Sequence, residues 1–193
     1  MLIHDITKHL NTIKQLSENK DSNITQYISE IVDDFNIMNP IDYCNNPTVN
    51  LITHRYYEIC KKNNINFTIS IKNANIDFIK EHDITALLDN LLENAVESAL
   101  MTNEKFIDFS ISTRNSNFVI IKISNSCNKK PKYIDGTLVS SKSTSGMHGI
   151  GTRSIKRVVE KYNGNLEMKF DNDSKTFTSV IGINSNLTSN NQS

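Results

Sequence analysis

The first 38 residues contain two short segments in which apolar side chains recur every three or four positions, the spacing of a narrow helical stripe. The stripes consist of Ile3, Ile6, Leu10 and Ile13 in the first segment and Ile24, Ile28, Ile31, Phe35 and Met38 in the second. The polar stretch 17–23 lies between them, so we expect an antiparallel helical hairpin over residues 1–38. Because two such helices cannot bury both stripes alone, the hairpin is expected to dimerise into a four-helix bundle.

After residue 38 the helical spacing of apolar residues stops, which marks the start of a second part of the chain. Residues 39–45 begin the stretch NPIDYCNNP and predict a linker, residues 46–187 form the second domain, and residues 188–193 are expected to be a disordered tail. The helices expected in this domain cover 48–62, 84–101 with Asp83 as its cap, and 152–162, which ends at Asn163-Gly164. Alternating apolar positions predict strands over 65–71, 106–113, 118–124, 165–170 and 176–183.

This order of elements predicts the fold class. Consecutive strands joined by short turns favour a mixed or antiparallel sheet that is covered by helices on one face. We therefore expect an α+β protein, a two-layer α/β sandwich preceded by the helical hairpin. Residues 126–148 show almost no apolar periodicity and are expected to be one long loop. Such loops are usually disordered or act as lids over a site.

Composition narrows the class of protein. A chain of 193 residues with 37% hydrophobic residues can fold into one domain plus a smaller part. Its 21 Lys and Arg balance 21 Asp and Glu, so no overall charge draws it to nucleic acid or a membrane surface. Three widely spaced cysteines fit neither a disulfide framework nor a zinc site. Since no apolar run reaches the length of a membrane span, we expect a cytoplasmic location.

The candidate chemistry begins with a pair of asparagines. The sequence has no GxxxxGK[ST] loop, no GxGxxG after a strand, no GxSxG and no HExxH motif, so the common sites that these mark are not expected. Asn90 and Asn94 are four residues apart on the helix 84–101, and both side chains should share one face. Carboxamide oxygens suit Mg²⁺, although such amides can also cap or bridge neighbouring loops.

Glycines before the last helix add a second feature. The segment His148-Gly149-Ile150-Gly151-Thr152 leads into the helix 152–162. Glycine lets the backbone approach a ligand closely, and the free N–H groups of a helix N-terminus attract anions. Together with the asparagine pair and a loop rich in Ser and Lys, these residues suggest a nucleotide polyphosphate lying between two helices.

Three short segments, including the two just described, resemble the motifs of a known family. NLLENA (90–95), ISNS (123–126) and HGIGT (148–152) are similar, in order and spacing, to the N, G1 and G2 boxes of the Bergerat-type ATP-binding domain of sensor histidine kinases, Hsp90, gyrase and MutL. His4-Asp5 in the hairpin resembles the phosphoacceptor box of the quorum-sensing, peptide-pheromone receptor kinases. The resemblance covers about residues 3–184.

By this resemblance, Asn94 with help from Asn90 would bind Mg²⁺, Asn125 would hold the adenine amino group, and Lys142 would face the phosphates. The remaining nucleotide-binding positions that the resemblance implies are His148, Gly149, Gly151 and Thr152. The chain departs from the wider family at Asn125, where that family usually has Asp followed by glycines, and at Met147, which replaces the first glycine of the G2 box. An Asn oxygen still accepts from an amino group but carries no charge, so the departure concerns nucleotide affinity more than fold.

The resemblance also assigns roles in the hairpin. His4 would be the phosphoacceptor, and Asp5 would orient or deprotonate it by accepting from Nδ1–H, which leaves Nε2 as the nucleophile. Lys8 stands four residues after His4, where related kinases often use Asn or Thr for dephosphorylation, so phosphatase activity is not expected.

These expectations describe the core of a sensor histidine kinase. It would bind ATP and Mg²⁺, dimerise through the hairpin, phosphorylate itself and pass the phosphoryl group to a response regulator. Two alternatives remain: a kinase or ATPase of the same superfamily that resembles an anti-sigma factor, and a non-catalytic ATP-binding interaction module. Met1 stands three residues before His4, so we expect a fragment of a longer receptor that reaches the membrane only through upstream segments.

Overall fold

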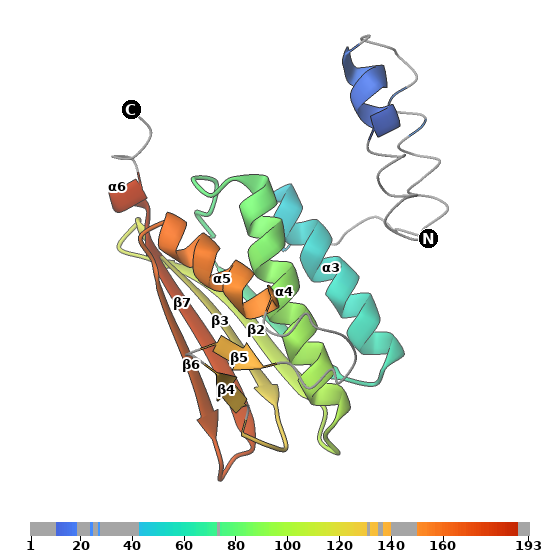
Figure 1. The fold of residues 1–193 in the computed structure, drawn as a ribbon, viewed down its shortest axis with the longest axis vertical. Coiled ribbons are helices and arrows are strands. Elements are labelled where there is room, and N and C mark those ends of the chain that lie inside the picture. The colour runs from blue at the N-terminus through green and yellow to red at the C-terminus, as the bar shows by residue number, and fades with distance from the viewer. Residues whose placement is uncertain are drawn as a thin grey trace. The chain divides into compact units, whose positions relative to one another are not determined.

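The chain divides into two compact units, Met1–Asn39 and Pro40–Ser193, in a computed structural model (Figure 1). The structure describes residues 11–18, 24, 27, 43–72, 74–130, 132–134, 137–139 and 150–188. In the first unit residues 11–18 are helical, which agrees with the helix expected around Ile13. Ile24 and Tyr27 are helical as well, and the remaining residues of the predicted hairpin, including His4, Asp5 and Lys8, lie outside the described residues, as do residues 189–193 of the predicted tail.

The second unit contains helices and strands close to those expected. The helices are α3 (Pro47–Lys62), α4 (Glu81–Leu100), α5 (Ile150–Lys161) and the short α6 (Ser185–Thr188). The strands are β1 (Asn66–Lys72), β2 (Phe106–Arg114), β3 (Phe118–Ser126), β4 (Lys132–Ile134), β5 (Thr137–Val139), β6 (Asn165–Asp171) and β7 (Thr176–Asn184). No described helix is both long enough and apolar enough to cross a membrane.

Five strands form one mixed sheet in the order β1-β2-β3-β7-β6. The β1–β2 pair is parallel, and the β2–β3, β3–β7 and β6–β7 pairs are antiparallel. Helices α3, α4 and α5 cover one face of this sheet (Figure 1). The predicted two-layer α/β sandwich with a mixed sheet is therefore confirmed.

The core lies between the sheet and the helices. Alternate residues of β2 and β3, such as Ile107, Phe109 and Ile121, are buried toward α4, whereas their neighbours in sequence belong to the outer face. Leu87, Leu88, Leu91 and Leu92 of α4 are buried against them. Full burial of each large apolar side chain is worth about 1.5–3 kcal/mol, so the alternation itself fixes which face of the sheet carries α4.

The start of α4 differs from the prediction. The helix begins at Glu81, Lys80 is its N-cap residue, and no side chain caps it. Asp83 lies inside the first turn, where its carboxylate accepts hydrogen bonds from Lys161 and Tyr162 at the end of α5. The prediction of Asp83 as the cap was therefore wrong, because partners from a distant part of the chain bind its side chain.

The region 126–148 also differs from the single loop expected. Strand β3 continues to Ser126, and β4 and β5 form a separate two-stranded antiparallel sheet. Each of these two strands has only three residues, too few for apolar alternation to be visible in the sequence. Helix α5 begins at Ile150, so Gly151 lies within its first turn and does not precede the helix.

The end of α5 agrees with the prediction. Asn163 adopts a positive φ of 49°, and the Gly164 N–H donates to the Val159 carbonyl at 2.8 Å, which closes the helix. A side chain at Gly164 would meet the Gly182 carbonyl at 2.9 Å, so glycine is also needed for the close approach to β7. This turn aims the chain from α5 directly into β6.

Candidate functional site

Three polar residues lie along α4 at intervals of four. Asn90 is half-buried, Asn94 is exposed and Ser98 is half-buried, on a helix whose buried residues are apolar except for Asp83. Residues at this spacing lie one above another on a helix, and the eight residue steps from Asn90 to Ser98 span about 12 Å. The stripe therefore offers two carboxamides and a hydroxyl along one line.

One end of this stripe meets the first turn of α5. A Cβ placed on Gly151 would lie 2.8 Å from the Asn90 Oδ1 atom, so the backbone of α5 passes directly beside this carboxamide. The Asn90 Nδ2 atom donates to the Ala86 carbonyl at 2.5 Å, which fixes the direction of the Oδ1 atom. The predicted neighbourhood of the asparagine pair and Gly151 is present at Asn90, and the adjacent Thr152 is buried.

The other end of the stripe meets the end of β3. The Ser98 hydroxyl donates to the Ser126 carbonyl at 3.0 Å, and the Asn125 Nδ2 atom donates to the same carbonyl at 2.9 Å. Asn125 is only 3% exposed and belongs to the inner face, since it pairs with Ile107 of β2. Holding Nδ2 on this carbonyl also sets the direction of Oδ1, the atom that could accept from an adenine amino group.

The Ser126 side chain connects the end of β3 to neighbouring segments, which sequence reasoning did not predict. Its hydroxyl accepts from Thr102 Oγ1 at 2.9 Å and from the Phe106 N–H at 3.2 Å. Ser126, which directly follows Asn125, therefore links the turn after α4 to the start of β2. The available sequence indication was the run Ser124-Asn125-Ser126, in which three polar residues follow a strongly apolar strand; all three are buried.

A second group missed by sequence reasoning joins the start of α4 to the end of α5. The Asp83 Oδ2 atom accepts from Lys161 Nζ at 2.6 Å and from the Tyr162 hydroxyl at 2.7 Å. Burial alone would raise the pKa of Asp83, but hydrogen bonds from Lys161 and Tyr162 outweigh burial and lower that pKa. The hydrogen bond to Asp83 likewise raises the pKa of Lys161.

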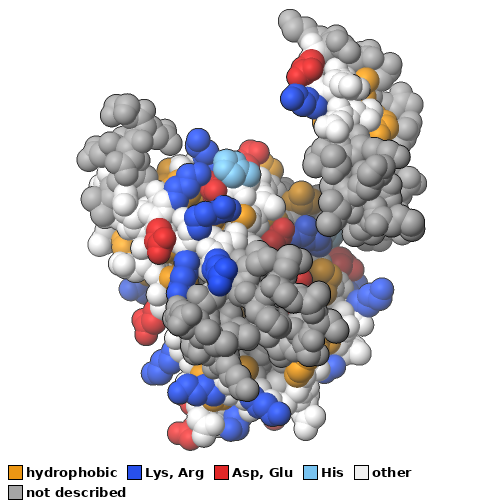
Figure 2. All heavy atoms as spheres, in the orientation of Figure 1, with side chains coloured by type: hydrophobic (Ala, Val, Ile, Leu, Met, Phe, Trp, Pro, Cys, Tyr) orange, Lys and Arg blue, Asp and Glu red, His pale blue; other side chains and the backbone are white. Residues whose placement is uncertain are grey.

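Basic side chains gather over α5 in the space-filling view (Figure 2). The helix contributes Arg153, Lys156, Arg157 and Lys161, of which all but the half-buried Lys156 are exposed. Such a local group of cations attracts anions even though the formal net charge of the chain is zero. The field around α5 is therefore suited to a polyphosphate.

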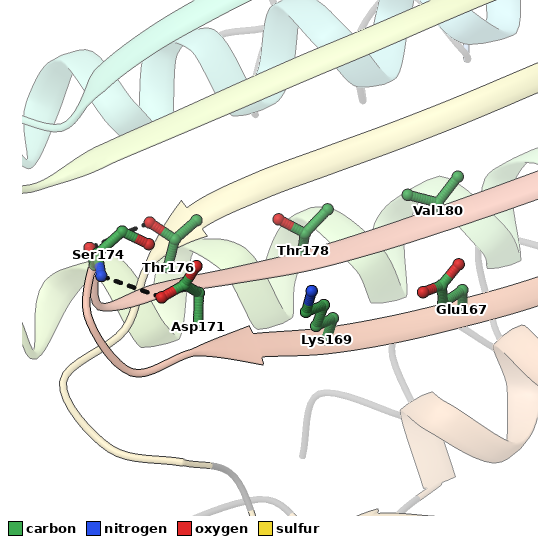
Figure 3. Close-up of a pocket in the computed structure, with 7 residues that line it drawn as sticks. All are labelled: Glu167, Lys169, Asp171, Ser174, Thr176, Thr178 and Val180. Atoms are coloured by element: carbon green, nitrogen blue, oxygen red, sulfur yellow. Dashed lines mark hydrogen bonds between the residues drawn. The ribbon is translucent and has the colours of Figure 1, made fainter.

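A separate hollow of about 280 Å³ lies on the outer face of β6 and β7 (Figure 3). It is lined by Glu167, Lys169, Asp171, Ser174, Thr176, Thr178 and Val180. Lys169 stands between Glu167 and Asp171 along β6, so opposite charges alternate within it. The hollow is on the face of the sheet away from α4, and it contains none of the residues predicted for the site.

Several predicted site residues lie outside the part of the chain that the structure describes: His4, Asp5, Lys142, His148 and Gly149. Asn90, Asn94, Asn125, Gly151 and Thr152 are all described. Of these, Asn90 and Gly151 are brought into contact, and Asn125 is linked to α4 through Ser98.

The carboxamide oxygens of Asn90 and Asn94 suit a Mg²⁺ ion that is also bound by the phosphates of a ligand. Within the described ranges no group of three or more His, Cys, Asp or Glu could hold a metal ion alone. Mg²⁺ keeps several waters and binds through a few protein oxygens together with phosphates. The exposed Asn94 could supply one such oxygen, with Asn90 one turn away, so these residues fit a metal that arrives with a nucleotide.

Comparison with known proteins agrees with this geometry. A family model described as the GHKL domain matches residues 79–183, which contain α4, β2, β3, α5 and most of β7. The chain is 29% identical over 112 residues to a probable C4-dicarboxylate sensor kinase of Bacillus subtilis (strain 168), and the match covers 54% of this chain and 20% of that protein. The chain thus spans about one fifth of this curated relative.

Solved structures show the same fold. The catalytic domain of the histidine kinase ThkA matches with a TM-score of 0.54 at 18% identity, over 77% of this chain and 98% of that one. The histidine kinase AdeS of Acinetobacter baumannii matches with a TM-score of 0.52 at 12% identity, over 95% of this chain and 98% of that one. Because the family model matches more than half of the chain, this protein belongs to the GHKL domain family.

Proposed function

We propose that this chain is the kinase core of a sensor histidine kinase, which binds Mg·ATP, phosphorylates its own His4 and transfers the phosphoryl group to an aspartate of a response regulator. The proposal rests on one observation above all. The polar stripe of α4 meets the glycine-containing first turn of α5 at Asn90 and the buried end of β3 at Ser98. A nucleotide along this stripe would have amide and backbone donors near its phosphates and a fixed carboxamide near its base.

The described residues would act mainly by binding and orienting the nucleotide. Asn94, assisted by Asn90, would provide oxygen to Mg²⁺, and the first turn of α5 would face the phosphates through its N–H groups. Asn125 would accept from the adenine amino group through Oδ1. When bound, Mg·ATP supplies the γ-phosphoryl group and the charge that neutralises the phosphates.

The transfer itself would depend on positioning. Asp5 would hold the Nδ1–H of His4 and leave Nε2 as the nucleophile for the γ-phosphorus. The bond between that phosphorus and the ADP oxygen breaks as the Nε2–P bond forms, and the product is a reactive phosphoryl donor. Accurate alignment contributes most of the rate in such reactions, because the protein has little other covalent chemistry to perform.

Partners follow from the same proposal. The apolar stripes of residues 1–38 favour a homodimer, and phosphohistidine requires a receiver aspartate as its acceptor. The resemblance of His4-Asp5 supports a receptor of the peptide-pheromone type that is anchored in the membrane by other segments. The name of the Bacillus subtilis relative instead concerns C4-dicarboxylates, so the class of input is a separate question from the kinase activity.

The test is incubation of the chain with γ-labelled ATP, followed by acid treatment. We expect label that is lost in acid and retained in alkali, absent in His4→Gln and unchanged in the matched control His9→Gln. Acid-stable label would favour the serine-directed kinase resembling an anti-sigma factor. Binding of ATP without any label, in a dimeric sample, would favour the non-catalytic interaction module.

A further inference from the structure

The interface between α4 and α5 is fixed at two places. At one, the Asp83 carboxylate of α4 accepts from Lys161 and Tyr162 where α5 ends. The Tyr162 hydroxyl also accepts from the Lys80 N–H at 2.9 Å, which ties the last turn of α5 to the N-cap residue of α4. At the other place, Gly151 of α5 lies against the Asn90 carboxamide of α4.

These two places are separated by a fixed length of helix. Asp83 and Asn90 are seven residues apart on α4, about 10 Å, and Gly151 and Lys161 are ten residues apart on α5, about 15 Å. The helices therefore run in opposite directions, with the charged cluster and the glycine contact at successive points along them. A shift of α5 at Asp83 would be transmitted by the rigid helix to Gly151.

Apolar packing alone would not define this position closely. Among the side chains of α5 that the structure describes, Ile155, Val158 and Val159 are the buried apolar ones. Their burial has no preferred direction, so several neighbouring positions of α5 would satisfy it. Hydrogen bonds to a carboxylate are directional and short. The Asp83 side chain is 9% exposed, so it also strongly requires these partners.

We propose that Asp83 is a positioning residue of the nucleotide site, which acts through Lys161 and Tyr162 to set where the first turn of α5 lies on Asn90. The inference rests on the proposed function, because it concerns the same ATP site. Asp83 need not touch the nucleotide. Its loss would let α5 shift along α4, so that the N–H groups of the first turn no longer meet the phosphates held near Asn90 and Asn94.

The variant Asp83→Asn tests this with a matched control. Arg55→Gln breaks another ion pair of α4, that between Arg55 and Asp89, which joins α4 to α3 and not to α5. Both variants remove one ion pair of α4, so both should lower stability. Only Asp83→Asn should weaken Mg·ATP binding, by about tenfold or more, measured by calorimetry at a temperature where each protein is folded; Arg55→Gln should stay within about twofold.

A spectroscopic measurement separates positioning from stability. In the nucleotide-free chain, Asp83→Asn should shift the amide resonance of Gly151 and the side-chain amide of Asn90, and Arg55→Gln should leave both in place. Lys161→Arg keeps the cation and should restore most of the affinity that Lys161→Met loses. If Asp83→Asn does not fold, Tyr162→Phe removes one hydroxyl only and should show the same resonance shifts with a smaller loss of affinity.

The outcomes distinguish a failure of the proposed nucleotide binding from a failure of the positioning role of Asp83. A wild-type chain that binds no Mg·ATP would overturn the proposed function and this inference with it. A wild-type chain that binds Mg·ATP, with a folded Asp83→Asn variant that binds equally well and leaves Gly151 and Asn90 unshifted, would overturn the positioning role alone.

Discussion

Helix α4 packs against α3 on one side and α5 on the other (Figure 1), and these two interfaces are built differently. Toward α3, the polar contacts include the Arg55–Asp89 ion pair and a 3.1 Å bond from the Tyr56 hydroxyl to the Asp89 carbonyl. Both charged side chains of that pair are partly exposed, Arg55 by 50% and Asp89 by 29%. Toward α5, by contrast, the Asp83 carboxylate is buried and bound by two side chains.

The difference shows which helix must be held in a closely defined position on α4. Exposed ion pairs contribute little and allow small movements, so α3 can cover the sheet without a precise position. A buried carboxylate with two donors costs more to form and allows less movement. That contact occurs where the helices also bring Gly151 onto Asn90, so the more demanding interface is the one that carries the candidate site.

Asn94→Ala should produce the largest effect. Removing the exposed carboxamide should lower Mg·ATP binding and self-phosphorylation at least about 100-fold, because the proposed metal ligand is lost while the buried apolar residues of α4 are unchanged. Asn165→Ala, which removes another exposed amide from the edge strand β6, is the matched control and should be silent. Full activity in a folded Asn94→Ala protein would remove this residue from the site.

The next largest effect concerns acid stability. At pH 7, Asp83→Asn should lower the free energy of unfolding by about 2 kcal/mol, since it removes the negative charge that strengthens the hydrogen bonds from Lys161 and Tyr162. Because the pKa of Asp83 is lowered on folding, its contribution is present above the unfolded value of about 4 and is lost as the pH falls through the folded value. Denaturant unfolding from pH 7 to pH 2 measures this.

The stability difference between wild type and Asp83→Asn should therefore shrink below about pH 4. A difference that stays constant across the whole range would mean that charge on Asp83 contributes nothing. The Arg55→Gln variant should show a smaller loss at every pH.

Gly151→Ala should weaken nucleotide binding by about tenfold. The added Cβ would lie 2.8 Å from Asn90 Oδ1, so the Asn90 side chain has to move from its position beside α5. Since alanine favours a helix more than glycine does, the variant should lose affinity without losing helix stability. In an Asn90→Ala background, Gly151→Ala should reduce nucleotide affinity much less, because the Asn90 Oδ1 atom that the new Cβ would displace is absent. Equal losses in both backgrounds would show that Gly151 acts independently of Asn90.

Arg55→Gln should have the smallest effect. Its pair with Asp89 is partly exposed, so its loss should cost less than about 1 kcal/mol and should matter still less in high salt. Thermal unfolding at low and high salt concentrations measures both expectations. A loss as large as that of Asp83→Asn would contradict the distinction between the two sides of α4.

The sequence predicted most of the sheet and singled out polar residues that the fold brings near one another, for physical reasons that also explain its failures. Strands such as β2 and β3 bury every second side chain, which makes them visible as alternation. Strands β4 and β5 are too short to show it. The partners of Asp83 follow it by 78 and 79 residues, and no local pattern can reveal contacts over that separation.

The site itself was predictable in residue type more than in geometry. Asn90, Asn94 and Gly151 stand out because amides interrupt an apolar helix and a glycine lies near a helix start. The close approach of Gly151 to Asn90, and the link from Ser98 to Ser126, depend on how α4 crosses α5 and β3. Local spacing carries no information on that crossing.

The most direct test of the central claim is to locate ADP or a non-hydrolysable ATP analogue, with Mg²⁺, by NMR on the folded chain. The account predicts the largest shifts at the side-chain amides of Asn90, Asn94 and Asn125 and at the Gly151 N–H, with Ser174 and Thr178 of the outer hollow unmoved (Figure 3). Shifts confined to the outer face of β6 and β7, with the α4 asparagines unchanged, would contradict it.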